Sequence, residues 1–348
     1  MRVFGRVAVL AAAVMVAFAC GSSGGSSPGT TSGCSKTYKV GLVTDVGKLS
    51  DRSFNANSWQ GVVDAQHDTS LCVSGRYLES NSKEDYQKNL RLFGDGGYDA
   101  VVAVGFNLGA DAQTFARAYP KVKVIMVDSA PDNPTPDNVT GLLFREDQAG
   151  FLAGAAAGLY TRTNTIAGVY GLDIPPVHHY RVGYENGARY VNSKITTLGV
   201  YQTPCNCSKD FNDPDWGKAR GLEFAARNAD VIFGAGGSTG NGALLASLEK
   251  KVACIGVDVD QFVSYPEADD CLLTSAEKHL ALAVKTAIGQ VVRNQFKSGV
   301  QTFDASTAGV GVAPFHKFDS KLTSDQKARI DTIARGLKDG SIKTGAES

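Results

Sequence analysis

Three aspartates, Asp45, Asp128 and Asp258, follow short runs of β-branched residues, at the points where buried strands would end. Ligands of open α/β sheets bind outside the carboxyl ends of the strands, so we expect these carboxylates to share one cleft. A single aspartate in this position is often a helix cap or turn residue, but here both halves of the chain supply them. Because an ionised carboxylate only accepts hydrogen bonds, the cleft favours a ligand rich in hydroxyl or amine donors, such as a ribose, over a phosphate.

Aromatic residues lie close to two of these strand ends. Phe54 and Trp59 follow the first β-branched run, and Tyr180 follows the fourth. A heterocycle that stacks on such a ring gains about 1–3 kcal/mol per base. Trp59 falls inside a segment with helical periodicity, where core packing explains it. Phe54 and Tyr180 therefore indicate a platform for a flat ring beside the acidic residues.

The elements that must position these residues alternate along the chain. Short β-branched runs are followed by segments of helical period, which is typical of parallel sheets with helices on both faces. The order βαβαβα occurs twice, so we expect an α/β fold with two lobes. The expected strands are 38–43, 100–104, 122–127, 165–170, 231–234 and 252–257, and the expected helices are 53–66, 83–93, 108–119, 148–160, 182–191, 216–227, 241–249 and 276–296.

The amino terminus predicts export. Arg2 and Arg6 precede an apolar run, residues 8–19, which is shorter than a membrane span and therefore reads as a signal peptide. The run ends at Cys20 in a stretch that resembles a bacterial lipobox, so we expect a lipid on Cys20 and a protein anchored to the outer face of the cell membrane. Residues 21–33 contain only Gly, Ser, Thr and Pro and predict a flexible tether.

Charge and cysteine content narrow the class of protein. The 35 Lys and Arg residues equal the 35 Asp and Glu residues in number, so no net field favours nucleic acid as a partner. Beyond Cys20 the cysteines are even in number, which indicates disulfides in an exported chain. Nearness along the chain favours Cys34 with Cys72 and Cys254 with Cys271, which leaves Cys205 with Cys207. The spacing of Cys205 and Cys207 does not match a zinc motif, and we expect neither a metal nor a cofactor.

Several motifs together resemble one family. The segment Val43-Thr44-Asp45-Val46-Gly47, with Asp51-x-Ser53-Phe54-Asn55 and Trp59-x-Gly61, is similar to the opening of the basic membrane protein family, the PnrA-like nucleoside-binding lipoproteins of ABC transporters. The likeness covers nearly the whole mature chain through Asp128, Gly150-Phe151-Leu152-Ala153-Gly154, Tyr180-x-x-Gly183, Gly236-x-x-x-Gly240-x-Gly242, Val257-Asp258-x-Asp260-Gln261 and Thr274-Ser275-x-x-Lys278. Each motif is weak alone, and their order and spacing make the set specific.

The resemblance implies an architecture and a function. It implies a type I periplasmic-binding fold, with two doubly wound parallel-sheet lobes joined by a three-segment hinge that close on a nucleoside, a purine before a pyrimidine. We expect a signal peptide at 1–19, the lipidated cysteine and linker at 20–36, one lobe from 37–145 and 262–300, and the other from 146–261 and 301–345. The implied partner is an ABC transporter permease, and the implied state is a monomer.

The resemblance also implies roles for individual residues. Phe54 and Tyr180 would sandwich the base, and Asn55 and Asp128 would bond its edge. The family commonly has Phe where Tyr180 stands, and the loop after Gly47 carries Lys48 where many members have a second glycine.

The remaining implied roles concern the sugar and the loops. Asp258 and Lys278 would hold the ribose hydroxyls, Gly237 would offer backbone contacts, and Asp45 would orient the first loop.

The sequence also allows two other functions. Residues 236–240 match G-x-S-x-G around Ser238, and Asp258 and His279 follow in the order of a serine hydrolase triad. The interval from Ser238 to His279 is short for such a triad, and no oxyanion segment is evident, so we expect a binding protein and not an enzyme. A surface adhesin or sensor ectodomain of the same fold is the third reading.

Overall fold

The computed structural model describes residues 34–205 and 207–346. The expected signal peptide, the lipidated Cys20 and the tether at 21–33 lie outside the described residues. Within the described residues, no helix combines the length and the apolar character that a membrane crossing requires.

The first sheet has six parallel strands in the order β11-β5-β4-β3-β1-β2. Helices α1 and α9 pack on one face, and α2 and α3 contribute to the separate core on the other face. The strands are β1 (Tyr38–Thr44), β2 (Val73–Leu78), β3 (Ala100–Val104), β4 (Lys123–Val127), β5 (Val139–Phe144) and β11 (Gly299–Phe303); the helices are α1 (Phe54–His67), α2 (Asp85–Asp95), α3 (Gly109–Ala118) and α9 (Leu280–Val292), with 3-10 turns η1 (Leu49–Asp51) and η2 (Phe106–Leu108).

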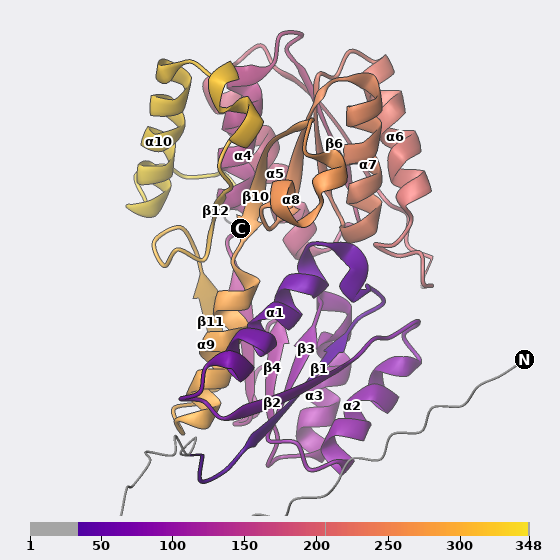
Figure 1. Cartoon of the computed structure of the whole chain (residues 1–348), viewed down its shortest axis with the longest axis vertical. Helices are drawn as coiled ribbons and strands as arrows, with labels where there is room; N and C mark the ends of the chain where they lie inside the picture. Colours follow the sequence, from indigo (N-terminus) through magenta and orange to yellow (C-terminus); the bar gives the residue numbers. More distant parts are fainter. Residues whose placement is uncertain (1–33, 206, 347–348) are drawn as a thin grey trace, which may run out of the picture. The chain divides into compact units, whose positions relative to one another are not determined.

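The second sheet has six strands in the order β12-β10-β9-β8-β6-β7, with β12 antiparallel to β10. Figure 1 shows its helices, such as α4, α6 and α7, grouped apart from α1, α2 and α3 of the first sheet. Its strands are β6 (Thr165–Tyr170), β7 (Thr196–Tyr201), β8 (Val231–Ala235), β9 (Ala253–Asp258), β10 (Leu272–Lys278) and β12 (Val310–Val312). Its helices are α4 (Glu146–Tyr160), α5 (Pro175–Val191), α6 (Pro214–Ala226), α7 (Gly237–Lys250), α8 (Gln261–Ser264) and α10 (Ser324–Lys338), with 3-10 turns η3 (Pro266–Ala268) and η4 (His316–Lys321).

Helices α4 and α5 pack against each other without room for side chains between them. A Cβ atom on Gly154 would lie 1.9 Å from the carbonyl oxygen of Tyr184, and one on Gly187 would lie 1.9 Å from that of Phe151. The Ala- and Gly-rich sequence of α4 permits this close approach, and it fixes the position of α5 beside the strands of the second sheet.

The chain passes between the two sheets three times. The first crossing lies between Phe144 and Glu146, the second at His279, and the third between Phe303 and Val310. Backbone hydrogen bonds join the crossings, from Arg145 N to Phe303 O at 2.9 Å and from His279 N to Gly309 O at 2.9 Å. The two parallel-sheet α/β lobes and the three crossings between them match the fold that we expected.

Two expected boundaries differ from these crossings. We expected 262–300 in the first lobe and a helix over 276–296, but β10 (Leu272–Lys278) belongs to the second sheet and α9 begins only at Leu280. The residues of β10 pair with β9 and β12 and are mostly buried, so sheet pairing overrides the helix propensity of Ala276, Glu277 and Lys278. In addition, β11 pairs with β5 as far as Phe303, beyond the boundary expected at 300.

Three disulfides join cysteines of the described residues, and they link the pairs that nearness along the chain favoured. Cys34–Cys72 ties the segment before β1 to the start of β2, and Cys254–Cys271 ties β9 to the segment before β10. Cys205–Cys207 lies in the loop between β7 and α6. The Cα atoms of these pairs are 5.8, 5.2 and 5.2 Å apart, in the usual range for disulfides.

Candidate functional site

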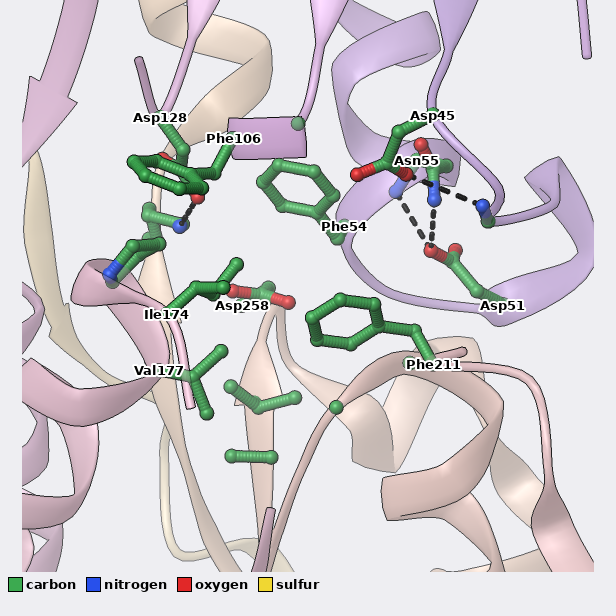
Figure 2. A pocket seen from close by; sticks show the side chains of 18 of the residues that line it. Asp45, Asp51, Phe54, Asn55, Phe106, Asp128, Ile174, Val177, Phe211 and Asp258 are labelled. Atoms are coloured by element: carbon green, nitrogen blue, oxygen red, sulfur yellow. Dashed lines mark hydrogen bonds and ion pairs between the residues drawn. The ribbon is translucent and has the colours of Figure 1, made fainter. Parts of the chain in front are cut away.

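A cavity lies where the carboxyl ends of the strands of both sheets meet, and Figure 2 shows the side chains that line it. It encloses about 610 Å³ of empty space, part of it open to solvent, which is in the range of small-molecule sites. The eight residues to which the sequence assigned ligand contacts all line this cavity: Asp45, Phe54, Asn55, Asp128, Tyr180, Gly237, Asp258 and Lys278.

Asp128 and Asp258 occupy matching places in the two lobes. Asp128 follows β4 and Asp258 ends β9, and these strands hold the same position in their sheets. Both residues adopt the left-handed conformation, with φ of 61° and 66°. Asp tolerates this conformation better than most residues, although it is still unfavourable, and such strain clusters at binding sites. The backbone therefore turns both carboxylates toward the cavity.

Lys278 is a buried cation at the second crossing. Its Nζ lies 2.6 Å from Asp128 Oδ2 and 3.3 Å from Glu146 Oε1, and its side chain is 2% exposed. The rings of Phe54, Phe144 and Tyr180 surround the same Nζ, with centroids 4.9–5.7 Å away. Burial works to lower the pKa of Lys278, but the neighbouring carboxylates raise it well above its ordinary value, so the lysine stays charged.

Burial dominates the electrostatics of the aspartates. It raises the pKa of Asp258 to about 6 against the opposing effect of Lys278. It also raises the pKa of Asp45 to about 7, where a backbone hydrogen bond from Gly47 opposes it. Burial works in the same direction on Asp128, whose contact with Lys278 favours the ionised form. Because burial raises the pKa of these carboxylates toward neutrality, hydrogen bonds donated by a ligand would favour their ionised form.

Two buried oxygens in the wall of the cavity have no hydrogen-bond partner among the described residues. They are Asn55 Oδ1 and Asp128 Oδ1. The orientation of the Asn55 amide is fixed, because its Nδ2 donates to Asp51 Oδ2 at 3.0 Å. A buried acceptor left without a partner costs about 1–3 kcal/mol. The pair therefore suits a bound molecule that presents donors.

Asp51 and Asp45 shape the turns of the first lobe. Asp51 accepts backbone hydrogen bonds from Ser53, Asn55 and Ala56 and so begins α1 with Asn55 in place. Asp45 Oδ1 accepts from Gly47 N at 3.2 Å, a hydrogen bond within the first loop. Gly105, with φ of 110°, passes so close that a Cβ there would lie 2.1 Å from Asp45 Oδ2.

Several residues that line the cavity were missed by the sequence reasoning, and among them are Asp51, Phe106 and Phe211. Phe106 is 40% exposed, and Phe211 is half-buried in the loop before α6. Figure 2 shows Phe54 and Phe211 reaching the same space from different lobes. Asp51 stood inside the family motif, a signal that could have found it. Phe211, by contrast, lies in a loop with no periodicity to mark it.

The expected ring of Tyr180 lies deeper than these phenylalanines. Its hydroxyl donates to Asp258 Oδ1 at 3.2 Å, and its ring packs edge-on against Phe233, with centroids 6.0 Å apart. Tyr180 is only 3% exposed. It therefore contacts the acidic end of the cavity more than the open centre.

The two lobes touch each other at the rim of the cavity. Asn241 Nδ2 donates to Asp51 O at 2.9 Å, and Arg52 and Ser264 exchange two hydrogen bonds of 3.2 and 2.8 Å. Gly237, with φ of 57°, lies close to Phe211 and to the other lobe, since a Cβ there would lie 2.9 Å from Phe211 O and 3.9 Å from Asp51 Cβ. These contacts describe lobes that are closed on each other.

The serine hydrolase reading has no matching geometry. His279 Nδ1 lies 2.6 Å from Ala308 O, and its Nε2 lies 3.5 Å from Glu277. Asp258 pairs with Tyr180, and none of the described contacts joins Ser238 to either residue. Across residues 34–205 and 207–346, no group of three or more His, Cys, Asp and Glu side chains could hold a metal ion.

Comparisons with known proteins agree with this architecture. A structure of an ABC transporter solute-binding protein from Aeropyrum pernix superposes with a TM-score of 0.77 at 24% identity, covering 88% of this chain and 92% of its own. A relative from Lactococcus lactis, named ABC transporter nucleoside-binding protein BmpA, is 29% identical over 350 residues, which are 95% of this chain and 97% of its own. An uncharacterized lipoprotein from Pyrococcus furiosus is 31% identical over 325 residues, covering 89% of this chain and 77% of its own.

A family described as ABC transporter substrate-binding protein PnrA-like, or Bmp, matches residues 38–339. The match spans both sheets and every residue that lines the cavity. Proteins of this kind bind a small solute and work with a membrane permease, and they are not enzymes. By sequence, fold and the position of its cavity, the chain belongs to the Bmp family of PnrA-like ABC transporter substrate-binding proteins.

Proposed function

We propose that the chain binds a nucleoside, a purine in preference to a pyrimidine, in the cavity between its lobes and delivers it to an ABC transporter permease. The observation that carries the proposal is the grouping of complementary features in one cavity. The residues that line it include aromatic rings, Asp258, and Asn55 and Asp128, each of which has a buried oxygen without a partner among the described residues. A nucleoside offers a flat base, edge donors and ribose hydroxyls to match them.

In this proposal the base lies between Phe54 and Phe211, and its donors meet Asn55 Oδ1 and Asp128 Oδ1. The sequence assigned the second stacking ring to Tyr180. Because that ring is buried and its hydroxyl is engaged by Asp258, the more accessible Phe211 is the better partner for a base. Tyr180 remains part of the wall.

The ribose lies at the acidic end of the cavity. Asp258 accepts hydrogen bonds from its hydroxyls, and the charge of Lys278 keeps the surrounding carboxylates compatible with one another. Gly237 brings the backbone of α7 close to the same place. A 5′-phosphate would meet Asp45, Asp51 and Asp258 and is disfavoured, because Lys278 is already paired with two carboxylates.

The direct test identifies the solute. The mature protein is purified, denatured and extracted, and the released small molecules are identified by mass spectrometry. Calorimetry of protein refolded without ligand then compares nucleosides, free ribose and nucleotides. We expect tight binding of nucleosides alone. Equal affinity for ribose and for nucleosides would remove the base from the proposal.

The Asp258→Asn variant tests the ribose contact. The amide keeps the shape of the side chain but loses a charged acceptor, so we expect nucleoside binding to weaken by about 1.5–3 kcal/mol in calorimetry. The matched control is Asp260→Asn, two residues further along, where the carboxylate contacts His316 and does not line the cavity. Equal losses in both variants would contradict a ribose role for Asp258.

The proposal places the protein on the outer face of the cell membrane through a lipid on Cys20. The name of the Pyrococcus furiosus relative, an uncharacterized lipoprotein, supports this placement. The Cys20→Ser variant should appear in the soluble fraction of cells or medium, while the parent sediments with membranes. Continued sedimentation of the variant would point to another anchor.

A further inference from the structure

Tyr180 carries a hydroxyl into the wall of the cavity, where it meets Asp258. Tyr180 Oη lies 3.2 Å from Asp258 Oδ1 and 3.4 Å from Ala276 O. A phenol has one proton, and the charged carboxylate is the stronger acceptor at the shorter distance. The Tyr180 hydroxyl therefore donates its hydrogen bond to Oδ1 of Asp258.

The other oxygen of this carboxylate is available to a ligand. Asp258 Oδ2 has no hydrogen-bond partner within residues 34–205 and 207–346, and Figure 2 shows the side chain between the two lobes, facing the open space. We propose that Tyr180 is a positioning residue, which holds the Asp258 carboxylate in one orientation and leaves Oδ2 free to accept a ligand hydroxyl. The identity of that ligand rests on the proposed function; the coupling between Tyr180 and Asp258 does not.

The packing around Tyr180 is rigid enough for this role. Its ring lies edge-on to Phe233, and Lys278 Nζ lies 5.7 Å from its centroid. The backbone is fixed as well, because a Cβ on Gly150 of α4 would lie 2.4 Å from Tyr180 O. The hydroxyl can therefore constrain Asp258, since the ring that carries it has little freedom to move.

The hydroxyl also affects the charge of Asp258. Burial raises the pKa of Asp258 to about 6; Lys278 lowers it, Asp51 and Glu146 raise it, and the hydrogen bond from Tyr180 lowers it. Asp128 and its ion pair with Lys278 face the same region from β4. Without the phenol donor, the pKa of Asp258 would rise further toward neutrality. A protonated Asp258 is a weaker acceptor, so binding should be strongest above this pKa and decline as the pH falls through it.

The test removes one oxygen atom from the protein. In Tyr180→Phe, carboxyl ¹³C NMR of protein with labelled aspartate should show Asp258 titrating at higher pH than in the parent, with its signal assigned through Asp258→Asn. Nucleoside affinity at neutral pH should fall severalfold, and its decline on acidification should begin at higher pH. A residue with a merely structural role would move neither profile.

The matched control is Tyr184→Phe, one turn further along α5. Tyr184 is also buried, but its hydroxyl has no hydrogen-bond partner among the described residues. This variant should leave both the Asp258 titration and the pH profile of binding as in the parent.

A double-mutant cycle completes the test. Once Asp258→Asn is present, adding Tyr180→Phe should change the affinity little, because the positioned carboxylate is already gone. An Asp258 titration unchanged in Tyr180→Phe would overturn the inference, as would an equal loss of affinity in the Asp258→Asn background. A parent that binds no nucleoside while Tyr180→Phe still shifts Asp258 would remove the proposed function and leave the positioning role supported.

Discussion

Phe54 and Phe211 reach the cavity from different lobes, so neither lobe alone can enclose a flat ring. Stacking on one aromatic face is worth about 1–3 kcal/mol per base. We therefore expect Phe54→Ala and Phe211→Ala each to weaken nucleoside binding by an amount in this range, measured by calorimetry.

The control for these variants is a second ligand, free ribose. Free ribose has no aromatic face, so its weak binding should be the same in the parent and in both variants. The double variant should lose less than the sum of the single losses, because one base contacts both rings. Fully additive losses would indicate that the two phenylalanines do not share a ligand.

For individual residues, the sequence predicted the positions of the aspartates better than those of the aromatic rings. Asp45, Asp128 and Asp258 follow recognisable strands, and the carboxyl end of a parallel strand has a fixed relation to the ligand site. The side chain of Phe211 is placed by a loop whose path depends on hydrogen bonds to Gln202 and Thr239. No local pattern encodes such contacts, so this residue could not be found without the fold.

The loop between β7 and α6, residues 202–213, is the element that presents Phe211. Gln202 bonds Lys209 O and the backbone N–H of Phe211, at 3.0 and 3.1 Å. Asp210 joins this loop to its disulfide, since its carboxylate accepts from Cys205 N and its own N–H donates to Cys207 O. The disulfide therefore helps to hold the loop that carries the ring.

Replacing both Cys205 and Cys207 with Ser should weaken nucleoside binding by less than Phe211→Ala does, because the ring is still present but less ordered beforehand. Calorimetry measures this loss. The control replaces both Cys34 and Cys72 with Ser. This disulfide lies at the amino ends of β1 and β2, away from the cavity. The control variant should leave affinity unchanged and lower thermal stability more, since its disulfide closes the longer loop. The reverse pattern would contradict this assignment.

Strands were predictable from the sequence where both of their faces are buried, because such strands consist almost entirely of apolar residues. The six expected strands are present to within one residue at each end, because central strands of parallel sheets are continuous apolar runs. Edge strands such as β2, with the sequence VSGRYL, are half-exposed and lack that signal. Helix α10 was also missed, although Thr323 and Gln326 form a capping box that the sequence contains.

At the scale of the whole molecule, the described residues of the two lobes meet through few polar contacts at the rim of the cavity. Arg52 bonds the backbone of Ser264 and lies 3.9 Å from Glu267 of the other lobe, with both charged side chains about half exposed. Such an exposed ion pair is worth about 0.2–1 kcal/mol. A ligand that bridges the lobes binds the closed state. Removing this ion pair can therefore weaken ligand binding by no more than the free energy that the pair contributes to closure.

We therefore expect Arg52→Ala to weaken nucleoside binding by no more than severalfold, and to enlarge the radius of gyration of ligand-free protein in small-angle X-ray scattering. Arg117→Ala is the control, because Arg117 pairs with Asp132 within the first lobe at similar exposure. That variant should change neither quantity. An equal loss of affinity in both variants would show that Arg52 does not act through closure.

The buried cluster of Lys278, Asp128 and Glu146 lies directly beside the first and second crossings. In a rotation about an axis through those crossings, an atom moves in proportion to its distance from the axis. Opening would thus carry Arg52 and Ser264 far apart while Lys278 hardly leaves Asp128. An arriving solute would meet this charged cluster already assembled. Its capture would then consist of bringing together the rim residues of the two lobes.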